Sequence, residues 1–487
     1  MKDASESSPP GTLTRMALSG GLWTTLSTLI TKGLGGVKTV ILARFLSPSD
    51  FGLMGLALVI VGTVNHFSYP GLYTALIQKE ELAREDLEAG WWIHALRGTS
   101  LFLLAFVLAG TIAEFYEERQ LKLVLQLVSL TFLLEGFKSI GLVRLNRALD
   151  FRRLMWVNQV ANLASLVVAV VLAWKWQNIW ALVAAHVVQL AVSTVMSYLI
   201  EPFLPRLKLN WSRVKQLMHF GKYVFAAGTF YIVILRGNEF VLGKVVGVEV
   251  YGYYALALSL VAMVSTPSVG AVTVVAFPAM SRLQEDPERL ESAYLRVFRT
   301  TVLLTTPALL GLAIFGRDII VLILGPKWMP MLSSLIWLCM FHWFHCLGLT
   351  LHSLYNAMGE VAWLAKLRFA QMVLYLVGII PLAVHFGPAG AAFWLFIVAA
   401  AVFFVHLVGT SRYFSGLSSK MIRVVVSYWP LFVIQAGVAW LHTRLPSRWL
   451  TMLTLGGFYL LFAAAFSLWK EKDLIMDSVK NLQSGRR

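Results

Sequence analysis

Long apolar stretches separated by short polar breaks run through almost the whole chain. From about residue 17 to residue 469, runs of roughly 20 mostly apolar residues alternate with breaks such as LSPSD, KWQN and FGPAG. A helix of that length rises about 30 Å, which matches the hydrocarbon core of a membrane. The alternating segments of about ten residues that build a membrane β-barrel do not occur in the sequence. The pattern therefore predicts an all-α polytopic membrane protein.

The breaks delimit fourteen expected helices, which follow a polar tail over residues 1–16. Their expected ranges are 17–42, 51–78, 89–113, 121–143, 155–173, 179–200, 217–240, 251–278, 297–316, 332–355, 367–386, 390–411, 422–441 and 449–469.

Composition and charge agree with a membrane protein. The chain is 58% hydrophobic and only 14% charged, with a mean hydropathy of +0.71, whereas soluble domains are about a quarter charged. The net charge of +16 follows the loops. Lys and Arg are about three times more frequent in the two tails and the even-numbered connections than in the odd-numbered ones. This bias predicts that both termini are cytoplasmic, and it explains the basic balance without a nucleic-acid partner.

Seven charged residues fall within the expected helices. A Lys, Arg or Asp in the middle of a span costs about 2.5–3.5 kcal/mol on insertion scales, so such a residue usually faces a water-filled cavity or a partner. Five of the seven are basic, and guanidinium and ammonium groups are the usual ligands of phosphate. The surplus of positive charge predicts a cationic cavity for an anion. The seven residues are Lys32, Lys38, Arg97, Glu135, Lys138, Arg236 and Glu239.

The distance of each charged residue from the end of its helix helps to decide whether its role is functional or structural. Each glutamate has a basic residue three positions away, so each such pair is expected to share a helix face. Lys38, Lys138 and Arg236 lie within about two turns of a helix end, where snorkelling or structural pairing explains them as well as function does. Lys32 and Arg97 are deeper and have no local partner. For these two the sequence favours a functional cavity.

No cofactor and no catalytic motif is expected. The chain has no phosphate-binding P-loop, no nucleophile elbow and no HExxH motif. Cys339, His342 and Cys346 share one helical face, but a single helix rarely supplies a complete metal site, and no second cluster accompanies them. These absences argue against an ATP-driven pump within this chain and weaken the case for a membrane enzyme, and no metal site is expected.

Several motifs resemble the polysaccharide-exporter branch of the MOP superfamily. ILARFLSPSDFGLMGLALVI (41–60), NEFVLGKVVGVEVYGYYALALSL (238–260) and AFPAMSRLQEDPERL (276–290) occur in the order seen in that branch, followed by LGPKW (324–328) and LYNAMGE (354–360). The second motif often carries Asp where this chain has Asn238 and Glu239.

The resemblance implies a flippase of the bacterial cytoplasmic (inner) membrane. It would move undecaprenyl-pyrophosphate-linked oligosaccharides to the outer leaflet for O-antigen, capsule or exopolysaccharide synthesis, alongside a glycan polymerase or glycosyltransferases. The fold it implies has two six-helix lobes, at 17–200 and 223–411, joined by a cytoplasmic linker at 201–222 and rocking around a central cavity. Residues 412–487 would add two helices and a cytoplasmic tail. Arg236 would join Lys32 and Arg97 in holding the anionic head group, and Glu239 would pair with Arg236 or take a proton.

Two other functions remain open at this point. A multidrug or organic-cation antiporter of the related MATE branch predicts an acidic cavity, whereas the charges within the expected helices are mostly basic. A membrane glycan polymerase or ligase predicts a large extracytoplasmic loop with clustered Arg, His or Asp. The longest outward loop expected here, at about 316–331, is short for such a site.

Overall fold

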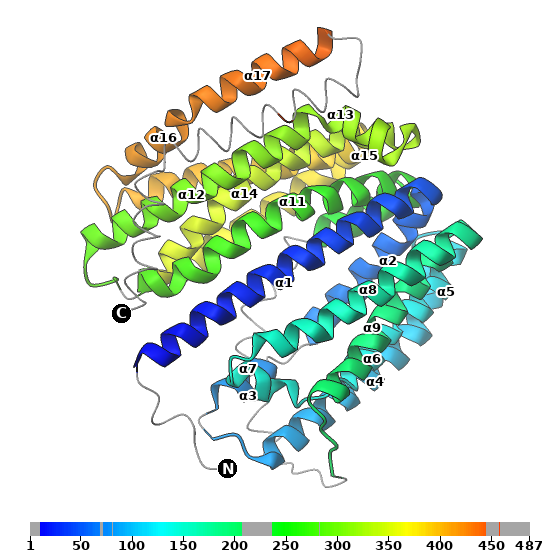
Figure 1. Cartoon of the computed structure of the whole chain (residues 1–487). Coiled ribbons are helices and arrows are strands. Elements are labelled where there is room, and N and C mark those ends of the chain that lie inside the picture. The colour runs from blue at the N-terminus through cyan, green and yellow to red at the C-terminus, as the bar shows by residue number, and fades with distance from the viewer. Residues whose placement is uncertain are drawn as a thin grey trace. The chain divides into compact units, whose positions relative to one another are not determined.

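The computed structural model describes residues 10–68, 72–79, 81–206, 236–281, 283–444 and 457, and within these ranges every regular element is helical (Figure 1). Ten of the helical segments are long and apolar enough to cross a membrane. The fold class predicted from the hydrophobic pattern is therefore confirmed. The expected helices at 217–240 and 449–469 lie largely outside the described residues, so the total of fourteen stays a prediction.

The chain forms two compact units. The first comprises residues 1–256 and 368–391, and the second comprises 257–367 and 392–487. The lobe boundaries expected from the sequence, 17–200 and 223–411, stay a prediction.

The helices of the N-terminal half belong to the first unit. They are α1 (Pro10–Phe45), α2 (Pro48–Ser68), α3 (Leu72–Gln78), α4 (Arg84–Phe115), α5 (Arg119–Val128), α6 (Leu130–Gly136), α7 (Leu142–Arg147), α8 (Phe151–Trp176) and α9 (Trp180–Ile200).

The helices that follow are α11 (Val248–Ser281), α12 (Pro287–Ile314), α13 (Gly316–Asp318), α14 (Leu332–Ala357), α15 (Val361–Thr410), α16 (Leu417–Ser427) and α17 (Trp429–Arg444). A π-helical turn at Ile319–Leu324 and a 3₁₀ segment at Pro326–Met331 precede α14. Residues 236–245 are also helical.

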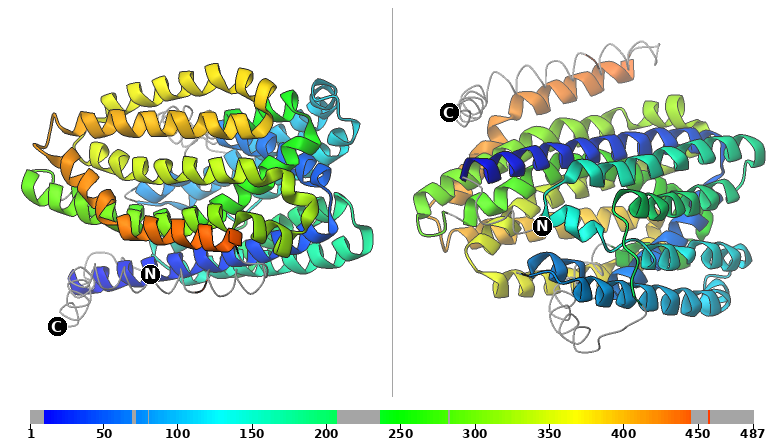
Figure 2. Two further views of the ribbon diagram at one scale, coloured as in Figure 1. Left: turned by 90° about the horizontal axis from the view of Figure 1, so that it is seen from above. Right: turned by 60° about the horizontal axis from the view of Figure 1, so that its bottom comes forward.

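Small residues set the packing of α1, α8 and α9. Helix α8 packs against both α1 and α9, and α1 runs beside α8 in Figures 1 and 2. The buried face of α8 carries Ala161, Ser165, Ala169 and Ala173, one residue per turn. Small side chains at this spacing let helix backbones approach closely in a membrane, where apolar contacts gain little over lipid.

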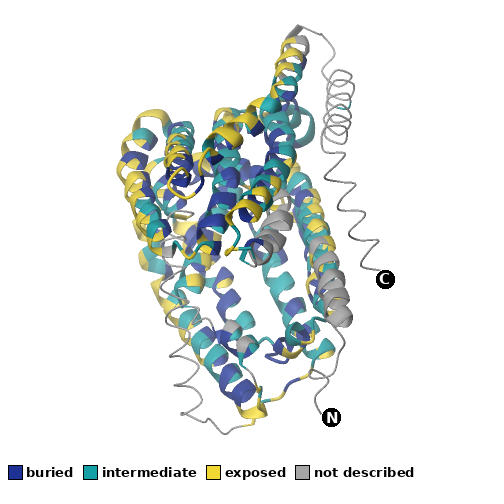
Figure 3. Ribbon diagram, turned by 90° about the vertical axis from the view of Figure 1, so that its left-hand side faces the viewer, coloured by how far each residue is buried: buried dark blue, intermediate teal, exposed yellow. Residues whose placement is uncertain are grey.

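The outer faces of the helices are apolar and exposed. On α4, Leu103, Leu104 and Val107 are all more than half exposed, and exposed positions alternate with buried ones along the helices in Figure 3. A soluble protein rarely leaves so many large apolar side chains uncovered. These faces fit contact with lipid.

One break in the helices differs from the sequence prediction. The expected helix 121–143 is three helices, α5 to α7, with irregular backbone between Gly136 and Leu142. Ser139 explains how that break is tolerated: its N–H donates to Ser197 Oγ of α9 at 3.0 Å, and its hydroxyl donates to the Glu201 carbonyl at 2.7 Å. Irregular backbone at membrane depth persists only where neighbouring groups satisfy it.

The expected break at FGPAG is confirmed within α15. Gly387 has φ 61° and ψ −152°, a conformation that favours glycine, and it separates two helical stretches at the expected boundary between 386 and 390. The following Pro388 cannot donate to the helix ladder.

The second unit has an aromatic and leucine-rich core. Tyr294 and Phe298 of α12 are fully buried, as are Leu351 and Tyr355 of α14. The Phe298 ring stacks on Phe403 with their centroids 6.5 Å apart. Asp286 caps the N-terminus of α12, because its side chain accepts a hydrogen bond from the Arg289 N–H, and Pro287 is the first residue of the helix.

Candidate functional site: a polar cavity in the first unit

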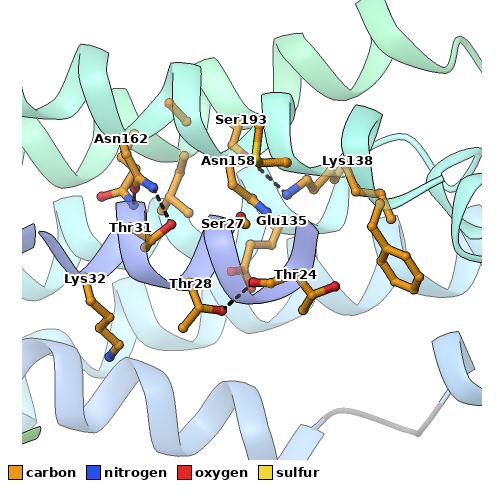
Figure 4. A pocket seen from close by; sticks show the side chains of 16 residues that line it. Thr24, Ser27, Thr28, Thr31, Lys32, Glu135, Lys138, Asn158, Asn162 and Ser193 are labelled. Carbon is orange, nitrogen blue, oxygen red and sulfur yellow. Dashed lines mark hydrogen bonds between the residues drawn. The ribbon is translucent and has the colours of Figure 1, made fainter. Parts of the chain in front are cut away.

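A cavity of about 490 Å³ lies among the helices of the first unit (Figure 4). Its walls come from α1, α8 and α9, with α6 and the break after it on another side. Most of the residues that line it are polar, and five are apolar. The polar residues are Thr24, Ser27, Thr28, Thr31, Lys32, Glu135, Lys138, Asn158, Asn162, Gln189 and Ser193, and the apolar ones are Phe151, Leu154, Met155, Ala161 and Leu190.

Neutral side chains on three helices are joined by hydrogen bonds. Gln189 Nε2 of α9 donates to Asn162 Oδ1 of α8 at 2.8 Å, and Asn162 Nδ2 donates to Thr31 Oγ1 of α1 at 3.2 Å. Gln159 Nε2 also donates to Thr31 Oγ1, at 2.9 Å. This chain of amides fixes α1, α8 and α9 around the cavity and orients the side chains that line it.

Two lysines and one glutamate supply the formal charge of the cavity lining. Lys138 Nζ donates to Ser193 Oγ of α9 at 2.8 Å. Lys138 lies in the break after α6, so it does not continue the helix face of Glu135 as the three-residue spacing predicted. Glu135 Oε2 accepts instead from Asn65 Nδ2 of α2 at 2.7 Å.

Lys32 is a cavity cation whose ammonium has no hydrogen-bond or ion-pair partner among the described residues. Its side chain is half-buried and leaves α1 on a different side from Thr31 (Figure 4). Because an ammonium at this depth needs water or an anion, Lys32 is available to a ligand in the cavity.

Arg97 lies beside the cavity rather than in its lining. Its Nη1 donates to Ser68 Oγ at 3.0 Å and to the Asn65 carbonyl at 3.3 Å, and its Nη2 donates to Asn65 Oδ1 at 3.0 Å. Asn65 thus joins the Arg97 guanidinium to the Glu135 carboxylate. Arg97 has no oppositely charged residue close to it in its own helix, but groups of α2 accept hydrogen bonds from its guanidinium. A direct role of Arg97 in ligand binding stays a prediction.

A close helix crossing brings Arg97 and Glu135 to the same level. Gly98 of α4 faces Gly136 of α6, and a Cβ at Gly98 would lie 2.4 Å from the Phe132 carbonyl oxygen and 2.9 Å from Gly136 Cα. The two charged residues precede these glycines in their sequences. Glycine at both positions therefore permits the approach that Asn65 bridges.

The remaining predicted cations lie elsewhere in the first unit. Lys38 Nζ donates to Ser165 Oγ of α8 at 3.2 Å. Arg236 Nη1 pairs with Glu239 Oε1 at 2.9 Å, as the spacing predicted, with the Arg236 side chain 48% exposed and the Glu239 side chain 5% exposed. Tyr251 OH donates to Glu239 Oε2 at 3.1 Å. The structure therefore brings Lys32, Glu135 and Lys138 into one cavity and places the other four outside it.

The histidine and cysteines of α14 form no cluster of metal ligands. His342 Nδ1 is 3.0 Å from Ser265 Oγ in the second unit, and Cys339 and Cys346 are buried free thiols. No group of three or more metal-binding side chains occurs in the part of the chain that the structure describes.

Comparison with known proteins identifies the family. Residues 41–333 match the family described as "Polysaccharide biosynthesis protein". The chain belongs to this family. The resemblance drawn from the five motifs is thereby confirmed, and the 238–260 motif of this polysaccharide biosynthesis protein carries the buried Asn238, Glu239, Tyr251 and Tyr254.

Relatives and solved structures extend this result. The chain is 25% identical over 370 residues to the lipopolysaccharide biosynthesis protein WzxC of Escherichia coli (strain K12), covering 76% of this chain and 75% of that protein. It is 25% identical over 306 residues to the succinoglycan biosynthesis transport protein ExoT of Rhizobium meliloti (strain 1021), covering 63% and 62%. The inward closed conformation of lipid II flippase MurJ has a similar fold, with a TM-score of 0.72 at 16% identity over 93% of this chain and 99% of that chain.

The sequence interpretation missed the neutral residues of the cavity. Asn158 and Asn162 are four apart and therefore share one face of α8 within an otherwise apolar stretch. That spacing was a usable signal, but a search restricted to charged residues passes over it.

Proposed function

We propose that this family member flips undecaprenyl-pyrophosphate-linked oligosaccharides from the inner to the outer leaflet of the bacterial cytoplasmic membrane by alternating access. Family membership and the many apolar spans support a membrane transporter of polysaccharide biosynthesis. The bias of Lys and Arg toward alternate connections supports cytoplasmic termini. The observation that carries the cargo assignment is the Lys32 ammonium, which has no partner among the described residues and lines a polar cavity with Lys138.

The charges of the cavity suit an anionic head group. Lys32 would contact the pyrophosphate directly, and Lys138 would contribute when its hydrogen bond to Ser193 is exchanged for one to phosphate. Glu135, held by Asn65, keeps the local charge balance at one surplus positive charge when the cavity is empty. The lipid tail would remain in the bilayer, because only the head group requires polar contacts.

The membrane potential favours movement in the export direction. Each negative charge that moves from a negative interior outward gains about 2.3 kcal/mol per 100 mV. A pyrophosphate-linked carrier would therefore be driven partly by the potential, and the cavity cations need only hold it at mid-membrane.

The decisive experiment replaces Lys32 with Met in a strain whose surface glycan depends on this protein. Loss of a hydrogen bond to a charged group costs about 1.5–3 kcal/mol, which corresponds to roughly a tenfold to hundredfold loss of affinity. We expect strongly reduced surface glycan and accumulation of the lipid-linked precursor, with the protein inserted at wild-type levels. Lys175→Met, at an exposed position near the end of α8, is the matched control. Normal glycan output from Lys32→Met would refute the cargo assignment.

A further inference from the structure

Asn158 of α8 has a side-chain amide with no hydrogen-bond partner among the described residues. It lies in the second turn of α8, is exposed, and lines the cavity. An amide transferred into hydrocarbon without hydrogen bonds costs several kcal/mol. Asn158 therefore requires water or a polar ligand in this cavity.

Gln189 offers a second set of unused atoms to the same space. Its Nε2 donates to Asn162 Oδ1, which fixes the side chain, but no described group donates to its Oε1. The cavity wall of α8 and α9 thus presents an acceptor from Gln189 and both donors and an acceptor from Asn158.

This mixture of hydrogen-bond donors and acceptors fits sugar hydroxyls better than it fits phosphate oxygens. Phosphate oxygens at neutral pH chiefly accept hydrogen bonds, so the Gln189 carbonyl would oppose them. Sugar hydroxyls both donate and accept, so they match both amides. The positive part of the lining and its amide part are therefore suited to different groups of one ligand.

We propose that Asn158 and Gln189 bind hydroxyl groups of the sugar that adjoins the pyrophosphate, while Lys32 holds the phosphate. This inference rests on the proposed function and adds a sugar-binding subsite to it. A cavity of about 490 Å³ falls within the size of ordinary ligand pockets. It provides room for the first sugar and the diphosphate, while the outer sugars extend beyond it.

The subsite is tested by binding to the purified full-length protein in detergent. The probes are undecaprenyl pyrophosphate and its glucosyl and galactosyl conjugates. The main variant is Asn158→Leu, which should retain the thermal stability of the wild type because none of the described residues hydrogen-bonds to the Asn158 side chain. Gln189→Met is the second variant, and Gln126→Met on α5, outside the cavity lining, is the matched control.

We expect Asn158→Leu and Gln189→Met each to weaken binding of a sugar-bearing probe about five- to tenfold, the effect of one hydrogen bond. Binding of undecaprenyl pyrophosphate should be unchanged in Asn158→Leu, and Gln126→Met should match the wild type with all probes. Gln189→Met also removes the hydrogen bond to Asn162, so its diagnostic readout is a larger loss for the sugar-bearing probes than for undecaprenyl pyrophosphate. Lys32→Met should weaken all three probes alike.

Three results would overturn the subsite. One is an equal loss for the bare and sugar-bearing probes in Asn158→Leu. Another is no loss for either. The third is wild-type protein that binds neither conjugate more tightly than undecaprenyl pyrophosphate. Failure of the proposed function is distinguishable, because wild-type protein would then bind none of the probes, or Lys32→Met would bind them all as well as the wild type.

Discussion

Replacing Gly98 with Ala should separate α4 from α6 and destabilise the protein. The added Cβ would lie 2.4 Å from the Phe132 carbonyl oxygen, whereas ordinary contacts begin near 3.4 Å. The obstructing atoms are backbone, so the helices must move apart by about 1 Å. Overpacking of this kind typically costs about 1–3 kcal/mol.

The same substitution also has a favourable component that must be separated from the clash. Ala is better than Gly in a helix interior by about 1 kcal/mol. Gly110→Ala, on the same helix, gains this component without the clash, since only the end of the Lys122 side chain lies within 4 Å, at 3.9 Å. The difference between the two variants therefore isolates the clash at about 1–3 kcal/mol.

The assay is the temperature at which half of the purified protein loses its monodisperse elution peak, at fixed detergent, lipid and heating time. Gly98→Ala should lose a few degrees relative to Gly110→Ala. Combining Gly98→Ala with Gly136→Ala should cost less than the sum of the single effects, because one separation of the helices relieves both clashes. If Gly98→Ala is as stable as Gly110→Ala, the close crossing, and with it the account of how Arg97 meets Asn65, is wrong.

Two further predictions concern charged groups of the first unit. Asn65→Leu removes the amide that joins Arg97 to Glu135. We expect a loss of about 3–6 kcal/mol in stability from two hydrogen bonds to charged groups, and wild-type thermal stability would contradict this. At the loop after α4, the hydrogen bond from Lys244 and its charge lower the pKa of Glu117. A lowered pKa stabilises the folded state above the ordinary carboxyl pKa, and this contribution is lost as the pH falls through the lowered pKa. The stability difference between wild type and Lys244→Met should therefore disappear at acidic pH and shrink in high salt, and an unchanged difference would contradict the pairing.

Most of the helices could be predicted from the sequence, because each helix that spans a membrane needs a long run of apolar residues. The expected helix 332–355 matches α14 closely, and the Gly387 break falls where expected. The expected helix 297–316 covers only part of α12, which already begins at Pro287. The prediction failed at residues 121–143, where the pattern was taken as one span but the backbone breaks after Gly136. The groups that satisfy the broken backbone are Ser197 of α9 and Glu201 just after it, some sixty residues later in the chain. Tertiary hydrogen bonds of this kind are not visible in a hydropathy pattern.

The same reasoning explains why the charges were only a partial guide to the site. A charge within a span indicates a polar surrounding, but that surrounding can be a partner as well as a cavity. Arg97 and Lys38 donate hydrogen bonds to Asn65 and Ser165 on neighbouring helices. Among the residues that the structure describes, Lys32 has no such partner. What distinguishes a ligand-binding cation from a structural one is thus the set of groups on other helices. In the same cavity lining, Asn158 has no hydrogen-bond partner among the described residues, and this indicates a polar ligand more strongly than the number of cations does.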